Sequence, residues 1–151
     1  MPRLDTSLES SGAEFLVLGH LLVEGIQAFK AYTNFPGYDL IATAPEKNRS
    51  CRVQVKSRWA TDFDGGFPIK NFDCDFVAFV QLNRGYRYHR KKHQNDNGRK
   101  APRFFIFPVE VVQTAQIPDS AWGKVFLRHI DDCESFENRW DLIAEFLEIA
   151  D

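Results

Sequence analysis

The sequence GYDLI at residues 37–41, followed by QVK at residues 54–56, determines how the centre of this 151-residue chain is expected to fold. Between them lies PEKN at residues 45–48, whose proline and asparagine favour a tight turn. If the turn is centred on its glutamate and lysine, residues whose numbers sum to 93 lie opposite each other in an antiparallel hairpin. Asp39 is then opposite Gln54, on the same face and with Cβ atoms about 5 Å apart.

The second strand of this hairpin, predicted over residues 51–59, has a clear period of two. Its polar residues alternate with residues that are mostly apolar, so one face is polar and the other faces a core. The predicted first strand covers residues 38–44. Lys56 lies two residues beyond Gln54 on the polar face, and a slip of one residue in the register would turn these side chains away. The polar face comprises Arg52, Gln54, Lys56 and Arg58.

The remaining periodicity predicts helices at both ends of the chain and further strands between them. A first helix, capped by Ser10 or Ser11, is expected to run to about Glu24. The last helix is expected to start at Asp132 and to carry an apolar stripe that includes Trp140. This order predicts an α/β (α+β) fold with one central mixed sheet flanked by helices. The other expected elements are strands at 26–33, 75–82 and 103–107, a loop at 60–74 and a short helix at 109–115.

Length and composition are those of one ordinary globular domain. The chain is 44% hydrophobic and contains 14 phenylalanines, which predicts an aromatic-rich core. No apolar run reaches the ~20 residues of a membrane-spanning helix, and the N-terminus lacks the features of a signal peptide. We therefore expect a cytoplasmic protein without a membrane partner. The three cysteines form no zinc or disulfide pattern and are predicted to be buried free thiols.

The formal net charge of −2 conceals a strongly basic segment at residues 84–103. Eight basic residues and one acid give this segment a charge of +7. A projecting basic arm suits a DNA groove, whereas the alternative is an exposed loop that charge keeps soluble in an interaction module. We predict a DNA-binding insertion at about residues 83–103. Its candidate DNA-binding residues are Arg84, Tyr86, Arg87, Tyr88, Arg90, Lys91, Lys92, Arg99, Lys100 and Arg103.

The polar face around Asp39 contains the residue types that phosphodiester hydrolysis requires. A hard cation such as Mg²⁺ binds oxygen ligands, and Asp39 would supply a carboxylate. Gln54 would offer its amide oxygen, and Val55 its backbone carbonyl. Lys56 would stabilise negative charge in the transition state and help to orient or deprotonate the attacking water. Glu14, on the first helix, would add a second carboxylate, bound directly or through water.

Each of these residues also has a purely structural interpretation. Glu14 and Ser11 match a capping box, in which the glutamate only caps its own helix. Asp39 could be a surface acid beside a turn, and Gln54 and Lys56 could belong to a solvated strand face. The prediction of a site therefore depends on the joint spacing of these residues.

This pattern resembles the PD-(D/E)XK nuclease superfamily. The resemblance is carried by Glu14, by Asp39 in its Gly-Tyr-Asp-Leu setting and by the Gln-x-Lys sequence at residues 54–56, and covers roughly residues 10–60. In size and in the Gln-x-Lys variant, the chain is most similar to group I intron-encoded homing endonucleases. It departs from the superfamily pattern in two places. No proline precedes Asp39, and glutamine replaces the usual acid at position 54, which removes a negative charge from the metal site.

The resemblance implies one nuclease domain over residues 1–151, with a restriction-endonuclease-like core built on a mixed sheet of four to five strands. It implies a Mg²⁺-dependent endonuclease, in which Mn²⁺ can substitute, that cuts double-stranded DNA at a specific site. The implied catalytic residues are Glu14, Asp39, Gln54 and Lys56, and the implied metal ligands are Asp39, Gln54, Val55 and Glu14.

Cutting both DNA strands with one site per chain calls for a homodimer or homotetramer on a near-palindromic target. Two alternatives to a homing endonuclease remain open at this point. The same site could serve a Holliday junction resolvase or a restriction endonuclease. The glutamine at position 54 could instead indicate a catalytically inactive DNA-binding relative.

Overall fold

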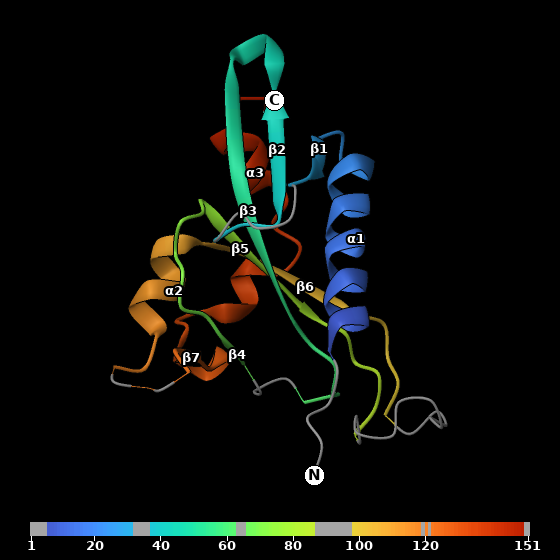
Figure 1. Ribbon diagram of the computed structural model, residues 1–151, viewed down its shortest axis with the longest axis vertical. Helices are drawn as coiled ribbons and strands as arrows, with labels where there is room; N and C mark the ends of the chain where they lie inside the picture. The colour runs from blue at the N-terminus through green and yellow to red at the C-terminus, as the bar shows by residue number, and fades with distance from the viewer. Residues whose placement is uncertain are drawn as a thin grey trace.

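The computed structural model (Figure 1) describes residues 6–31, 37–62, 66–86, 98–118, 120 and 122–149. Its helices are α1 (Ser7–Val23), α2 (Val109–Ala115) and α3 (Asp141–Phe146). Short 3₁₀ turns lie at η1 (Pro45–Lys47), η3 (Leu127–His129) and η4 (Cys133–Phe136). The strands are β1 (Gln27–Lys30), β2 (Leu40–Ala44), β3 (Arg49–Arg58), β4 (Phe67–Pro68), β5 (Phe76–Gln81), β6 (Arg103–Pro108) and β7 (Lys124–Val125).

A mixed five-stranded sheet in the order β1-β2-β3-β5-β6 forms the centre of the fold. Strands β3 and β5 are parallel, and the other neighbours are antiparallel. Strands β4 and β7 pair in a separate two-stranded sheet. The predicted α/β (α+β) fold with a central mixed sheet and flanking helices is therefore confirmed.

The β2–β3 hairpin, which extends to the top of Figure 1, has the register that the sequence predicts. Leu40 lies opposite Val53 and Ala42 lies opposite Cys51, so that paired residue numbers sum to 93. All four of these side chains are buried. Asn48, in the left-handed region with φ 54°, closes the turn after η1. The turn and the buried face therefore favour the same register.

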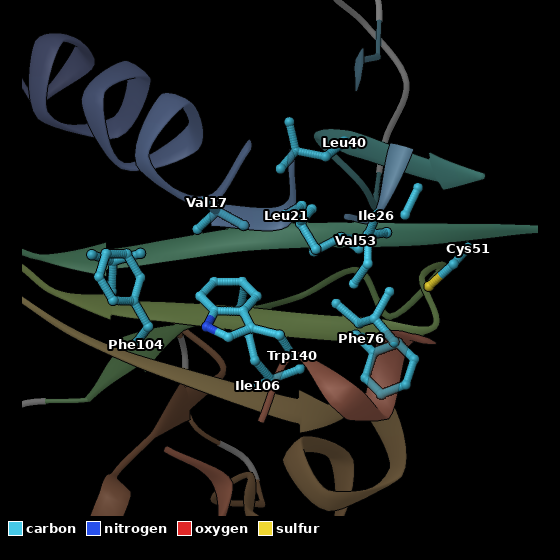
Figure 2. Close-up of a cluster of buried hydrophobic side chains, with 14 of the residues drawn as sticks. Val17, Leu21, Ile26, Leu40, Cys51, Val53, Phe76, Phe104, Ile106 and Trp140 are labelled. Carbon is cyan, nitrogen blue, oxygen red and sulfur yellow. The ribbon is translucent and has the colours of Figure 1, made fainter. Parts of the chain in front are cut away.

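Two hydrophobic clusters cover the two faces of the central sheet. On one face, α1 contributes Val17 and Leu21, and the segment around α3 contributes Trp140, which lies close to Phe104 and Ile106 (Figure 2). On the other face, α2 and the segments around β4 and β7 pack against the phenylalanines of β5 and β6. This second cluster includes Phe67, Phe79, Phe105, Phe107 and Val112.

The first helix begins earlier than predicted, at Ser7 instead of Ser10 or Ser11. Thr6 occupies the N-cap position, and its side chain makes no capping hydrogen bond. Glu14 therefore lies in the middle of α1, too far from the helix start to act in the capping box with Ser11. The structural interpretation of Glu14 as a cap is wrong, and its carboxylate faces other partners.

The C-terminal helix predicted to start at Asp132 is also wrong as a single element. The chain forms η4, breaks, and resumes as α3 only at Asp141. The break is held by β6: the Asn138 amide donates to the Phe104 carbonyl at 2.8 Å, and Phe105 bridges Glu137. Asn138 has φ 56°, which a continuous helix does not allow. Tertiary pairing with a neighbouring strand has thus overridden a helical apolar stripe.

The basic insertion leaves the sheet between β5 and β6. Its two ends are joined by the antiparallel bridge between Arg84 and Arg99 and by the hydrogen bond from the Lys100 amide to the Asn83 carbonyl. The predicted DNA-binding residues Arg87, Tyr88, Arg90, Lys91 and Lys92 lie outside the described residues.

Two expectations from composition can be compared with the structure. All three cysteines are buried and free, as predicted. Among the residues that the structure describes, no helix has the length and apolar character needed to cross a membrane.

Candidate active site

A cleft of about 470 Å³ opens beside β3, where β3 runs on past the start of β2. Its walls come from α1 and β4, and its floor is the second half of β3. All four predicted catalytic side chains line this single cleft, together with the backbone of Val55: they are Glu14, Asp39, Gln54 and Lys56. We call this feature the Asp39 cleft.

Gly37 lies just before Asp39 at this edge of the sheet, at a position that requires glycine. It has φ 94°, and a Cβ at this position would lie 2.8 Å from the Cβ of Asp73. Only glycine fits both the left-handed backbone and this close approach. Strand β2 starts at Leu40, opposite Val53, so the cleft edge of β3 beyond Gln54 is not covered by β2.

Asp39 is held at the mouth of the hairpin by three hydrogen bonds. Its amide donates to the Val53 carbonyl at 2.9 Å, and its own carbonyl accepts from the Ala31 amide at 2.9 Å. Its carboxylate oxygen Oδ2 accepts from the Val55 amide at 2.8 Å. The backbone of β3 thus fixes the orientation of the carboxylate before any ligand arrives.

Val55 also presents its carbonyl to this edge. The N–H and C=O groups of one strand residue point to the same side, and the Val55 amide already faces Asp39. The Val55 carbonyl therefore lies on the same edge of β3 as the Asp39 carboxylate. Its role as a metal ligand stays a prediction.

Gln54 is largely buried, with 9% of its surface exposed, yet it lines the cleft. Its Oε1 accepts a weak hydrogen bond from the Cys74 thiol, with an Sγ to Oε1 distance of 3.8 Å. Burial raises the pKa of Cys74 to about 11, so this thiol keeps its proton at neutral pH. Cys74 is a site neighbour that the sequence did not reveal, because it is 20 residues away and carries no motif.

Lys56 is a half-buried cation inside the cleft. Burial lowers its pKa, and attraction by Asp39 and then by Cys74 opposes that change. Among the described residues Lys56 makes no ion pair, so its charge is only partly compensated. A lysine in this state readily attracts an anion and gives up a proton more easily than an exposed lysine does.

Glu14 reaches the cleft from α1 and forms an ion pair with Lys30, with Nζ and Oε1 3.4 Å apart. Burial raises the pKa of Glu14, the negative charge of Asp39 raises it further, and Lys30 lowers it. The effect of Asp39 means that the two carboxylates lie close enough to repel each other. Two converging carboxylates are a common setting for a divalent cation.

The donor set of the cleft consists of oxygens, which suits Mg²⁺ or Mn²⁺. Within the described residues, no group of three or more histidine, cysteine, aspartate or glutamate side chains is arranged to hold a metal. The cleft offers two carboxylates instead, and its other oxygens come from an amide and a backbone carbonyl. The donors therefore fit a hard cation that keeps several waters, and they do not fit a closed zinc site.

A smaller cavity of about 170 Å³ adjoins the Asp39 cleft and shares four lining residues with it, Thr6, Glu9, Ser57 and Pro68. Arg58 and Lys124 bring positive charge to this cavity, although Arg58 is already bound to Asp62. Burial lowers the pKa of Lys124, and repulsion by Arg58 lowers it further. Positive charge thus continues beyond Lys56, from Arg58 on β3 and from Lys124 on β7.

The predicted DNA-binding residues that the structure describes fall into two groups. Arg84, Tyr86, Arg99 and Lys100 lie at the base of the insertion. Arg103 instead donates to Glu137 through Nε at 2.9 Å and through a terminal nitrogen at 2.8 Å. Its role in DNA binding stays a prediction.

Comparison with solved structures shows what this fold is similar to. The structure of a bacterial homing endonuclease, I-Ssp6803I, aligns with this chain at a TM-score of 0.60, over 93% of each chain and at 20% sequence identity. At this identity the match establishes similarity of fold. The sequence matches no protein-family model and no curated protein. The chain therefore has a homing-endonuclease-like fold, and its chemistry must be argued from its own residues.

Proposed function

We propose that this chain is a Mg²⁺-dependent endonuclease of the PD-(D/E)XK type that cuts double-stranded DNA at a specific site, as a homing endonuclease does. The observation that carries the proposal is the convergence of Asp39, Gln54, Lys56 and Glu14 in one cleft, at the open edge of β3. The similarity of fold to a bacterial homing endonuclease supports the same conclusion at a coarser level.

In this proposal Asp39 and the Val55 carbonyl are the principal metal ligands, with Gln54 and Glu14 beside them. Bound Mg²⁺ would acidify a water and neutralise charge on the phosphate. Asp39 is already oriented by the Val55 amide, so little reorganisation is required on binding. Mn²⁺ should replace Mg²⁺, because both prefer oxygen ligands.

Lys56 would act on the phosphate and the attacking water. Its ammonium group stabilises the extra negative charge that develops on the phosphate oxygens as water attacks phosphorus. Its lowered pKa also makes the neutral amine easier to reach, and that neutral form can accept the proton that the water releases. A P–O bond forms to the water oxygen, the ester bond from phosphorus to the departing sugar oxygen breaks, and that sugar oxygen takes up a proton.

DNA binding is assigned to the basic insertion at about residues 83–103, within a single nuclease domain. Its described base carries Arg84, Arg99 and Lys100 next to the end of the central sheet. Because each chain has one cleft and a duplex has two strands, we propose a homodimer or homotetramer on a near-palindromic target.

The test compares wild-type protein with Asp39→Asn, using supercoiled plasmid and a randomised duplex library with Mg²⁺. We expect wild-type cleavage at discrete sites and at least about a 100-fold loss in Asp39→Asn, because a metal ligand and its charge are removed. Titration calorimetry with Mg²⁺ and Mn²⁺ should give binding to wild type that is lost in the variant. Equal cleavage by the two proteins would contradict the proposal.

A second candidate is a DNA-binding relative that does not cut. It is favoured by the neutral Gln54, whose amide oxygen already accepts the Cys74 thiol hydrogen bond. Metal-independent binding of duplex DNA with no calorimetric signal for Mg²⁺ would select this candidate. Preference for branched over linear DNA in the same cleavage assay would instead indicate a junction resolvase.

A further inference from the structure

We propose that the outer face of α1 is a self-association surface, and that its partner is a second copy of this chain. The proposal rests on the proposed function in one respect, because two strands of a duplex require two clefts. The structural argument for the surface itself comes from α1 and the groove beside it.

Helix α1 is apolar on two opposite faces. Ala13, Val17 and Leu21 are fully buried against the sheet. At 3.6 residues per turn, the apolar residues on the other side fall within an arc of about 120° that also contains Gly12 and Gly19. These residues, with their exposed fractions, are Leu8 (87%), Val23 (84%), Phe15 (58%), Leu22 (51%) and Leu16 (38%). We call this arc the α1 stripe.

The α1 stripe is unlike the outer face of an ordinary surface helix. A helix that is apolar on all sides is normally covered on all sides, and monomers rarely expose contiguous apolar patches of several hundred square ångströms. No charged residue falls within the arc, so two copies could meet there without burying like charges. Scattered exposed apolar residues need no explanation, but five on one helix face do.

A groove of about 360 Å³ runs along one side of the stripe. Its α1 wall is formed by Leu8, Gly12 and Leu16 with Glu9 at the rim, and its opposite wall by Trp59, Leu82 and Arg84. The two charged residues of the groove have opposite signs. Gly12 leaves the floor open, since a Cβ at this position would have no atom within 4 Å. The groove can therefore receive a large apolar side chain from outside.

The stripe is complementary to itself. If two copies of α1 pair antiparallel about a two-fold axis at Phe15, Leu8 of one copy lies beside Leu22 of the other. Leu22 then enters the groove next to Gly12, and the same contact is repeated by symmetry. The seven-residue spacing of Leu8, Phe15 and Leu22 is that of a helix pair packed along a common seam.

The size of the stripe also fits a second copy. Its exposed apolar side chains amount to about 500 Å² in each chain, and two copies would bury about 1,000 Å², the lower limit for a specific interface. Area alone does not set the affinity, and the binding of both copies to one DNA would strengthen the association.

The test measures oligomeric state by sedimentation velocity from about 1 to 100 μM, without DNA or metal. We expect wild-type dimers and an at least ~10-fold weaker dimer for Phe15→Glu, because the change places charge at the two-fold axis. Phe29→Glu is the matched control, since Phe29 has a similar exposed fraction of 49% but lies on β1 outside the stripe. It should dimerise like wild type.

Gly12→Leu separates loss of the interface from loss of the fold. Replacing glycine in a helix interior favours the helix by about 1 kcal/mol, and the monomer has open space for the new side chain. The variant should therefore melt at a higher temperature under dilute conditions and yet dimerise at least ~10-fold more weakly, because the groove is filled.

A wild-type monomer throughout this concentration range would overturn the proposal, as would equal effects of Phe15→Glu and Phe29→Glu. Unchanged dimerisation of Gly12→Leu would also overturn it. These readouts do not depend on cleavage. A dimer that binds through the α1 stripe but cuts no DNA would remove the proposed function and leave the surface standing.

Discussion

Two cations of the central sheet, Lys56 on β3 and Arg103 on β6, differ in how far nearby acids compensate their charge. Strand β5 lies between the two. Arg103 binds Glu137 through two nitrogens and also donates to Glu134 at 2.9 Å, and these contacts raise its pKa, with the Glu137 hydrogen bonds as the main cause. Lys56 is more buried, makes no ion pair among the described residues, and has a lowered pKa.

This difference indicates that the charge of Arg103 is structural, whereas the charge of Lys56 is available to bind a ligand. Arg103 ties β6 to the C-terminal segment, where Glu137 bridges Phe105. Lys56 ties nothing together, and burying its charge costs stability that its neighbour Asp39 only partly restores. A buried charge that the protein compensates only in part is expected at sites where a bound ligand supplies the missing opposite charge.

The strongest expected effect concerns Lys56→Met, which keeps the length of the side chain and removes its charge. Cleavage of duplex DNA should fall about 100- to 1,000-fold, because one stabilising charge is lost in the transition state. The free energy of unfolding should rise by about 1 kcal/mol, because no buried charge remains. Plasmid cleavage and urea denaturation at pH 7 measure the two quantities.

The pH dependence of stability provides the control for Lys56→Met. The pKa of Lys56 is lower in the folded chain than its usual 10.5. Between these two values the unfolded chain binds more protons, so stability rises with pH in this window and the cost is fully present below it. The difference in stability between wild type and Lys56→Met should therefore shrink as pH rises toward 10.5. A less stable Lys56→Met at neutral pH would show that this lysine is structural.

Glu137→Gln tests the structural role of Arg103, and its effect should be smaller than the loss of cleavage in Lys56→Met. The free energy of unfolding should fall by about 1 kcal/mol, because a bidentate and partly solvated pair loses its charge. The Arg103 hydrogen bonds lower the pKa of Glu137 below 4.5, so wild type should lose the same contribution as pH falls through the folded pKa. Thermal denaturation at pH 7 and below pH 4.5 measures both.

DNA affinity of the same variant determines whether Arg103 is purely structural. If Glu137 keeps Arg103 away from DNA, releasing it would strengthen duplex binding and steepen its salt dependence. Unchanged affinity of Glu137→Gln is the outcome expected from the ion pairs. A rise in affinity would instead support the sequence-based assignment of Arg103 to DNA binding.

The hairpin and the C-terminal segment show why some of this was predictable from sequence and some was not. The β2–β3 register follows from a turn and an alternation within about 20 residues, and the predicted pairing holds from Leu40 opposite Val53 to Ala44 opposite Arg49. Asp39 lies just before the first of these pairs, and its amide donates to the Val53 carbonyl. The break before α3 depends on Asn138 pairing with Phe104, 34 residues away, and no local pattern indicates it.

The same distinction applies to the candidate site. The positions of Asp39, Gln54 and Lys56 are fixed by strand geometry and could be predicted. Two further residues of the site come from other parts of the chain: Lys30 pairs with Glu14, and Cys74 donates to Gln54. Neither belongs to a sequence motif that would have identified it. The predicted residues of the insertion from 87 to 97 lie outside the described residues.

Cys74 provides the smallest expected effect and tests whether the surroundings of Lys56 are set by weak contacts as well as by charge. Its thiol donates to Gln54 Oε1 at 3.8 Å, and its pKa of about 11 keeps the proton in place at pH 8. Cys74→Ala should lower Mg²⁺ affinity about two- to fivefold, because a weak donor that orients the amide is lost. Cys74→Ser retains a donor and should restore most of that affinity. Calorimetry on the folded proteins compares the three, and equal affinity of Cys74→Ala and wild type would mean that the packing around Gln54, not the thiol, orients this ligand.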